Sequence, residues 1–172
     1  MQSARSIKNE DEIMNLKHAA AIGDAAHHAI ASTVRPGVKE TDIQAAASHV
    51  MHTLGAQWVH NVQVTSGNRT NPHPHLSSDR LIQPGDLVFV DLVLLLNGYH
   101  TCYYRCFCCG KANRVQRDVH KRCYDMQQAG LERVKPGRTT ADIAGALMGS
   151  AKVNLFHEHV VVKEPGTQDR TP

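Results

Sequence analysis

The apolar positions near the start of the chain recur at helical spacing. Between Glu10 and Val34 the positions on one helical face fall three, four or seven residues apart: Ile13, Leu16, Ala20 and Ile30, with the polar His27 on the same face. Asn9, followed three residues later by Glu12, is typical of an N-cap with a capping-box partner. The sequence Arg35-Pro36-Gly37 ends the pattern, so we expect one long helix here.

A shorter helix and a first strand follow. Thr41 with Gln44 predicts a cap for a second helix that ends near Gly55. The residues from Trp58 to Thr65 are rich in strand-forming types, which predicts a β-strand. A polar loop with two prolines then runs through residues 71–74.

The middle of the chain carries a strong hairpin pattern. A turn at Pro84-Gly85-Asp86 precedes an apolar run from Leu87 to Leu96, which a single charge, Asp91, interrupts. Asn97-Gly98 is the typical two-residue hairpin turn, and a return strand is expected from Tyr99 to Cys109. The hairpin therefore has a defined register.

The helical pattern returns after the hairpin. A third helix is expected from Asn113, paired with Gln116 as its cap, to Val134. A fourth is expected from Thr140 to about Ala151, after a second Pro-Gly stop.

An internal repeat relates the two helical regions. The segment Val34–Ala46 shares its Pro-Gly stop and its later Asp-Ile pair with Val134–Ala146, at an offset of 100 residues. A repeat at this period is too long for a solenoid and indicates two similar halves that share one sheet. The second copy is followed by far fewer residues than the first, so we expect either a shortened second half or a fragment.

Composition narrows the class of protein. A chain of 172 residues suits a single domain over 1–172, with residues 1–8 and 163–172 expected to be flexible. A net charge of +3, with basic residues scattered among acidic ones, argues against nucleic-acid binding. No apolar run is long enough for a signal peptide or a bilayer span, which predicts a cytoplasmic protein without a membrane partner.

Asp91 is the most informative polar residue. A lone carboxylate in an apolar strand costs several kcal/mol unless it is paired or bound to a metal. The hairpin register pairs Asp91 with Tyr104 and makes Cys102 its diagonal neighbour, and the same face carries His100 and Cys106. A hydrogen-bonded carboxylate at a strand end is the alternative for Asp91, and a small buried apolar residue is the alternative for Cys102.

Several segments together resemble the pita-bread metallopeptidase family, which includes methionyl aminopeptidase, prolidase and creatinase. They are the opening residues 7–13, the loop 71–75, the strand 83–91, the hairpin return 97–107 and the two Pro-Gly/Asp-Ile repeats. The resemblance implies a binuclear hydrolase that uses manganese, cobalt or zinc. In it, Asp91 matches the first metal-binding aspartate, and the second falls on Cys102.

The resemblance also implies a loop histidine that stabilises the tetrahedral intermediate, as well as further ligands near the C-terminus. The spacing leaves His73 and His75 open for the loop role, and an exposed loop histidine is the alternative for each. His157 or Glu158 then matches a ligand if residues 154–162 are the family's final strand. An earlier His-Glu strand is the second alignment.

We therefore predict an α+β pita-bread fold with a curved, mostly antiparallel sheet, helices on one side and two pseudo-symmetric halves, the second shortened. The predicted function is hydrolysis of a C–N bond in a small peptide or amide, as by an Xaa-Pro aminopeptidase. The alternatives are a metal-free hydrolase like creatinase and a relative without activity, which is either a partner-binding module or a truncated, inactive form. The open edges of an unfinished sheet predict either a homodimer or poor stability.

Overall fold

The computed structural model describes residues 5–71 and 76–150, with side chains described to Met148. The chain divides into two compact units, which we term the N-terminal unit (Met1–Ala112) and the C-terminal unit (Asn113–Pro172). Each unit is described by itself. The prediction of a single domain over the whole chain stays a prediction.

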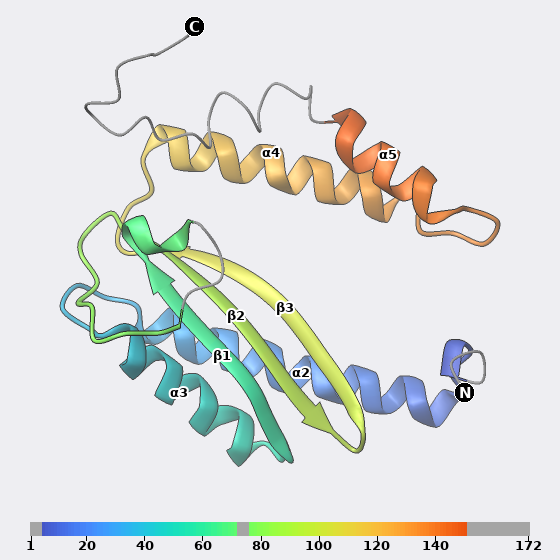
Figure 1. The fold of residues 1–172 in the computed structure, drawn as a ribbon, viewed down its shortest axis with the longest axis horizontal. Helices are drawn as coiled ribbons and strands as arrows, with labels where there is room; N and C mark the ends of the chain where they lie inside the picture. The colour runs from blue at the N-terminus through green and yellow to red at the C-terminus, as the bar shows by residue number, and fades with distance from the viewer. Residues whose placement is uncertain (1–4, 72–75, 151–172) are drawn as a thin grey trace, which may run out of the picture. The chain divides into compact units, whose positions relative to one another are not determined.

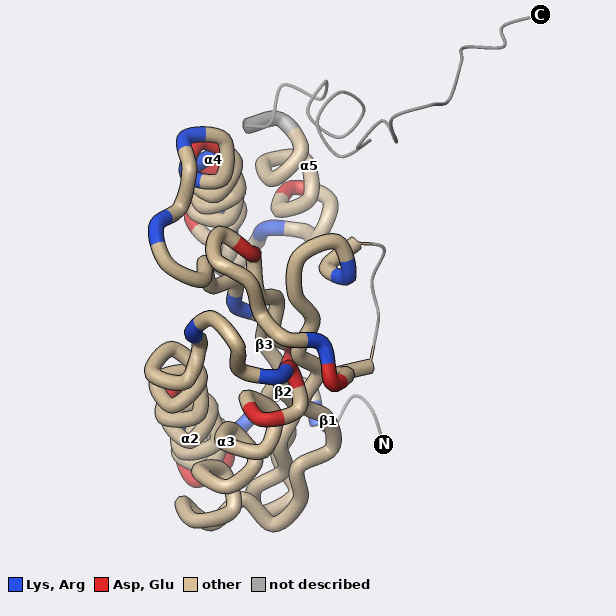
Figure 2. Tube along the Cα trace, turned by 90° about the vertical axis from the view of Figure 1, so that its left-hand side faces the viewer, with Lys and Arg blue, Asp and Glu red and all other residues tan. Residues whose placement is uncertain are grey.

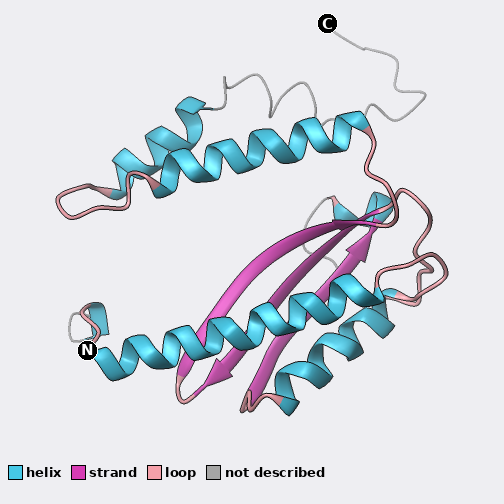
Figure 3. Ribbon diagram, turned by 180° about the vertical axis from the view of Figure 1, so that it is seen from behind, coloured by secondary structure: helices cyan, strands magenta, loops and turns pink. Residues whose placement is uncertain are grey.

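The N-terminal unit is a layer of helices on an antiparallel sheet. Its sheet has the order β1-β2-β3, and α2 and α3 cover one face of it (Figures 1 and 3). In chain order the elements are α2 (Glu10–Thr33), α3 (Glu40–Thr53), β1 (Trp58–Ser66), the 3₁₀ helix η1 (Gly67–Thr70), β2 (Leu87–Leu96) and β3 (Tyr99–Cys108). The predicted α+β class with helices on one side is confirmed for this unit.

The alternation of side chains along β2 separates the core from the opposite face. Four residues of β2 are fully buried in the core that the helices cover: Val88, Val90, Leu92 and Leu94. They pack in one cluster with Ile30 and Ile43 of the two helices. Because successive strand residues point to opposite faces, Asp91 lies on the face away from the helices.

The β2–β3 hairpin has the predicted register. Asn97 and Gly98 both have positive φ, 50° and 84°, as a type I′ turn requires. Asp91 pairs with Tyr104. On the other side β1 pairs with β2 so that Gln63 lies opposite Asp91, with an irregularity between Val59 and Asn61.

The described part of the C-terminal unit is a helical hairpin of α4 (Arg114–Leu131) and α5 (Thr140–Ser150). The two helices approach closely at Gly130, where a Cβ atom would stand 2.7 Å from a methyl carbon of Leu147. Asn113 and Gln116 form the predicted capping box. This hairpin resembles α2 and α3 in sequence but has no strand among its described residues.

The internal repeat is visible in the backbone. Gly37 and Gly137 both have φ of +83°. The side chain of Asp42 accepts a hydrogen bond from the N–H of Lys39, and that of Asp142 accepts one from the N–H of Thr139. The two copies therefore share a turn and a cap, 100 residues apart.

The same cap corrects one prediction. A cap formed by Thr41 and Gln44 is wrong, because Asp42 binds the N–H of Lys39 and the helix begins at Glu40. The long helix before the second Pro-Gly stop also ends earlier than expected, at Leu131.

Charges are mixed within each unit, as the composition predicts. Lysine and arginine lie among aspartate and glutamate on the trace of each unit (Figure 2). Among the described helices, none is both long and apolar enough to cross a membrane.

Candidate metal centre

Asp91 is buried in the middle of the sheet. Its side chain is only 7% exposed, on the central strand β2 and on the face away from the helices. Gln63 of β1 and Tyr104 of β3 are its cross-strand neighbours. A buried carboxylate in such a place needs a partner that offsets its lost hydration.

Cys102 is one such partner. Its Sγ donates to Oδ1 of Asp91 over 3.7 Å. Partial burial, together with the charge of Asp91, raises the pKa of the Cys102 thiol. The residue is exposed, so its reading as a small buried apolar residue is wrong, and a thiol that solvent can reach lies beside a buried carboxylate.

The separation of these two atoms suits a shared metal ion. Zinc binds carboxylate oxygen at about 2.0–2.2 Å and thiolate sulfur at about 2.3 Å, so tetrahedral ligands of these types lie roughly 3.6 Å apart. The observed 3.7 Å fits that geometry. Within the described part of the chain, however, no group of three or more His, Cys, Asp and Glu side chains gathers. Asp91 and Cys102 are thus the two candidate ligands that the described residues bring together.

Two uncharged residues, Tyr104 and Gln63, lie on either side of Asp91 in the sheet. The ring of Tyr104 stacks on that of Phe89 with centroids 5.5 Å apart. The charge of Asp91, followed by that of Cys102, raises the pKa of Tyr104. On the opposite side, the buried Oε1 of Gln63 has no hydrogen-bond partner among the described residues.

Sequence reasoning assigned no role to Gln63. The connection from β1 to β2 is long, and no two-residue turn fixes its register. The only sequence signal that could have identified Gln63 is a polar residue between two valines, Val62 and Val64, in a predicted strand.

The other predicted site residues lie outside the described residues. His73 and His75 belong to the segment between Asn71 and Leu76, and His157 and Glu158 lie beyond Ser150. The structure therefore brings Asp91 and Cys102 together, and the roles of the four others stay predictions.

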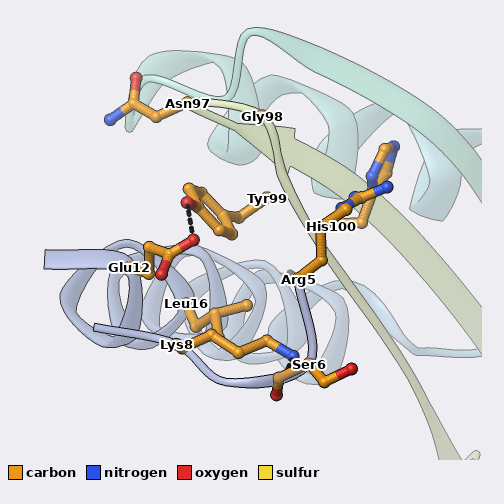
Figure 4. A pocket seen from close by; sticks show the side chains of 9 residues that line it. All are labelled: Arg5, Ser6, Lys8, Glu12, Leu16, Asn97, Gly98, Tyr99 and His100. Carbon is orange, nitrogen blue, oxygen red and sulfur yellow. Dashed lines mark hydrogen bonds between the residues drawn. The ribbon is translucent and has the colours of Figure 1, made fainter. Parts of the chain in front are cut away.

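A separate cavity lies at the tip of the hairpin. It has a volume of about 670 Å³, and Arg5, Lys8, Glu12, Tyr99 and His100 are among its lining residues (Figure 4). Glu12 is already engaged: hydrogen bonds from the N–H of Asn9 and then from the Tyr99 hydroxyl lower its pKa. Neither Asp91 nor Cys102 lines this cavity, so it is separate from the candidate metal centre.

Comparison with known proteins agrees with the resemblance seen in the sequence. The sequence model of metallopeptidase family M24 matches residues 14–163. The chain is 29% identical over 144 residues to an Xaa-Pro dipeptidase of Pyrococcus furiosus, covering 83% of this chain and 41% of that protein. It is 30% identical over 167 residues to the uncharacterized peptidase YqhT of Bacillus subtilis, covering 96% of this chain and 45% of that protein.

A solved structure gives the same result for the fold. The prolidase from Pyrococcus furiosus superposes with a TM-score of 0.81 at 29% identity, covering 86% of this chain and 44% of that one. The chain thus spans less than half the length of these relatives.

Proposed function

The chain belongs to metallopeptidase family M24 and has the α+β pita-bread fold of its prolidases. On this premise we propose that it serves metal-dependent hydrolysis of Xaa-Pro bonds in small peptides. Because the chain spans only 41% of the Pyrococcus relative, the activity, the substrate and the metal all belong to the proposal.

One observation carries it. A carboxylate that is 7% exposed lies in the centre of an otherwise apolar strand, within 3.7 Å of a thiol that solvent reaches. Burial of the Asp91 carboxylate in an apolar strand is costly, since the carboxylate loses hydration there. A bound cation offsets the cost, which supports a metal-binding role for the pair.

The donor types favour one metal over others. A thiolate is a softer ligand than a carboxylate, so Cys102 favours zinc over manganese or cobalt. A divalent ion held by Asp91 and Cys102 would act as a Lewis acid and activate water. His157 and Glu158 remain the proposed additional ligands from the C-terminal region.

The chain's own residues have defined tasks in this proposal. Asp91 and Cys102 are the residues that would hold the ion. The stacked rings of Phe89 and Tyr104 cover one side of Asp91, which limits the access of bulk water. His73 or His75 donates a hydrogen bond to the oxyanion of the tetrahedral intermediate.

An assay on the full chain tests the function. With zinc, manganese or cobalt added, hydrolysis of a Gly-Pro dipeptide is expected, and Asp91→Ala should abolish it. Asp118→Ala, on the exposed surface of α4, is the control that should keep it. Hydrolysis without metal that depends on His73 and His75 would instead support the creatinase-like alternative. Absence of both metal and activity would leave a partner-binding role.

Assembly and location complete the proposal. Within the described residues, β1 and β3 are edge strands with one neighbour each, and open edges favour pairing with a second chain. We keep a homodimer and a cytoplasmic location as predictions. Light scattering of the purified chain tests the first.

A further inference from the structure

The cavity at the tip of the β2–β3 hairpin has the size of a small-molecule site. Its volume is about 670 Å³, and ligand pockets typically measure roughly 300–1,000 Å³. Two parts of the chain that lie far apart in sequence form its walls (Figure 4). One is the segment that leads into α2 with the first turns of that helix, and the other is the turn between β2 and β3. The proposed hydrolysis gives this cavity no task.

Side-chain hydrogen bonds hold the two walls together. The Tyr99 hydroxyl donates to Oε1 of Glu12 over 2.9 Å. Nδ2 of Asn97 donates to Oδ1 of Asn15 over 2.8 Å. These bonds join residues 87 and 82 positions apart, and they dock the hairpin turn on α2. The outline of the cavity is therefore fixed before any ligand binds, which lowers the cost of binding.

The acidic group of the lining already has its partners. Glu12 accepts a hydrogen bond from the N–H of Asn9 through Oε2 and one from the Tyr99 hydroxyl through Oε1. These two hydrogen bonds, and after them the charge of Lys8, lower the pKa of Glu12. Both carboxylate oxygens are thus occupied by groups of the fold itself.

The basic groups of the lining lack such partners. Arg5 and Lys8 form no salt bridge with another described residue, and Nζ of Lys8 donates to the carbonyl of Ser6 over 3.3 Å. The charge of Arg5 reaches the hairpin wall: the hydrogen bond to Glu12 raises the pKa of Tyr99, and Arg5 opposes that rise. Two permanent cations therefore face one cavity without an anion of their own.

The geometry of the donors suits a phosphate group better than a carboxylate. Arginine offers a planar fork of N–H donors, lysine offers three, and His100 adds a ring nitrogen from β3. A phosphate monoester carries a charge of about −1.5 to −2 at pH 7 and presents three acceptor oxygens. A carboxylate has a single charge and two oxygens, which one arginine satisfies alone.

The cavity also has an apolar side. Leu16 lies one turn beyond Glu12 on α2 and lines the cavity together with Tyr99. Figure 4 shows the ring of Tyr99 between the hairpin backbone and α2. A ligand that carries a ring or a short apolar chain next to its phosphate group can contact both side chains.

We propose that this cavity binds a small organic phosphate. Arg5, Lys8 and His100 hold the phosphate group, and Leu16 and the ring of Tyr99 contact the organic part. Since Asp91 and Cys102 do not line the cavity, the proposal stands independently of the metal centre and of the peptidase activity.

Calorimetric titration of the full chain with phenyl phosphate tests the proposal. Phenyl phosphate should bind more tightly than inorganic phosphate, which lacks the ring. It should also bind about tenfold more tightly than benzoate, which has the ring but a single charge. Arg5→Gln and Lys8→Gln should each weaken the binding of phenyl phosphate by about tenfold, the effect of losing one charge-assisted hydrogen bond.

Matched variants control for general attraction of anions. Arg35→Gln and Lys17→Gln remove the same charges from exposed positions that do not line the cavity, and both should bind phenyl phosphate as the unchanged chain does. Arg5 and Lys8 are also exposed, so none of the four substitutions should shift the midpoint of thermal unfolding.

Each contrary outcome is specific. No binding of phenyl phosphate to the unchanged chain would overturn the proposal, and equal binding of benzoate would overturn the choice of phosphate. Equal losses in Arg5→Gln and Arg35→Gln would overturn it as well, because the attraction would then come from net charge alone. The titrations are repeated with a chelator present, and binding that disappears there would belong to a metal ion and not to this cavity.

Discussion

The thiol Sγ of Cys102 lies 3.7 Å from Oδ1 of Asp91, at diagonal positions of the β2–β3 hairpin. The two-residue turn at Asn97-Gly98 sets this relationship, because it fixes which residues of the two strands share a face. A soft donor on β3 and a hard donor on the central strand β2 thereby lie side by side. That combination distinguishes the centre from one built of carboxylates alone.

Cys102→Asp should change the metal preference of the chain. An oxygen donor replaces sulfur, so binding of manganese relative to zinc should strengthen by about tenfold, or 1.4 kcal/mol. Competition titrations with the two metals measure the ratio. Cys123→Asp is the control, because Cys123 is an exposed thiol of α4 and lies outside the β2–β3 hairpin. An unchanged ratio in Cys102→Asp would exclude Cys102 as a ligand.

His27 should make the folded state sensitive to acid. The side chain is 7% exposed, and neither ring nitrogen has a hydrogen-bond partner among the described residues. Burial, followed by the charge of Arg105, lowers its pKa from 6.5 to about 4, against an opposing effect of Asp24. Below pH 6.5 the unfolded chain binds a proton at His27, whereas the folded chain binds it only near pH 4. The free energy of unfolding therefore decreases as the pH is lowered from 6.5 to about 4.

The size of this effect can be measured by urea unfolding. Between pH 7.5 and 5 the loss assigned to His27 is roughly 2 kcal/mol, at 1.36 kcal/mol per pKa unit. His27→Phe, which retains an aromatic ring beside Tyr103, should remove that part of the pH dependence. His28→Phe changes the adjacent exposed position and should leave it in place. An equal pH slope in His27→Phe and the unchanged chain would refute the assignment.

Gly23→Ala should destabilise the N-terminal unit. A Cβ atom at this buried position of α2 would stand 2.5 Å from the hydroxyl oxygen and 2.9 Å from two ring carbons of Tyr103. That hydroxyl lies 3.0 Å from both the carbonyl oxygen of Ala20 and Oδ1 of Asp24 and shares its one proton between them, so a shift of the ring would weaken this hydrogen bonding. Overpacking of this kind costs about 1–3 kcal/mol, which outweighs the gain of nearly 1 kcal/mol in helix propensity.

Gly145→Ala is the matched control for this substitution. Gly145 lies inside α5, and nothing stands within 4 Å of a Cβ atom placed there. Here only the propensity gain applies, so the variant should be as stable as the unchanged chain or more stable. Thermal unfolding of both variants tests the pair, and a Gly23→Ala protein as stable as Gly145→Ala would contradict the packing argument.

The sequence predicted the features that short-range rules determine. The Asn97-Gly98 turn fixed the pairing of Asp91 with Tyr104, and the caps at Asn9 and Asn113 fixed two helix starts. The 100-residue repeat predicted the matching turns at Gly37 and Gly137. Each of these depends on residues only a few positions apart or on direct sequence similarity.

Features set by distant contacts were not predictable in the same way. The buried Glu40 carboxylate accepts hydrogen bonds from Ser66 and Ser78, which lie 26 and 38 positions away. No local sequence pattern marks a glutamate at a helix start as buried. The alignment of Gln63 with Asp91 depends on a connection of some twenty residues with no register rule of its own. The exposure of Cys102 depends on how much covers the outer face of the sheet, which a single strand's pattern does not encode.

The most direct test of the central claim is cobalt binding to the full chain, followed by elemental analysis and by sulfur-to-cobalt charge-transfer absorption. The account predicts bound metal with a thiolate band in the unchanged chain, loss of the metal in Asp91→Ala, and loss of the band in Cys102→Ser. Cys123→Ser, at an exposed thiol of α4, should change neither. Metal bound equally well by Asp91→Ala, or no metal in the unchanged chain, would contradict the proposed metal centre.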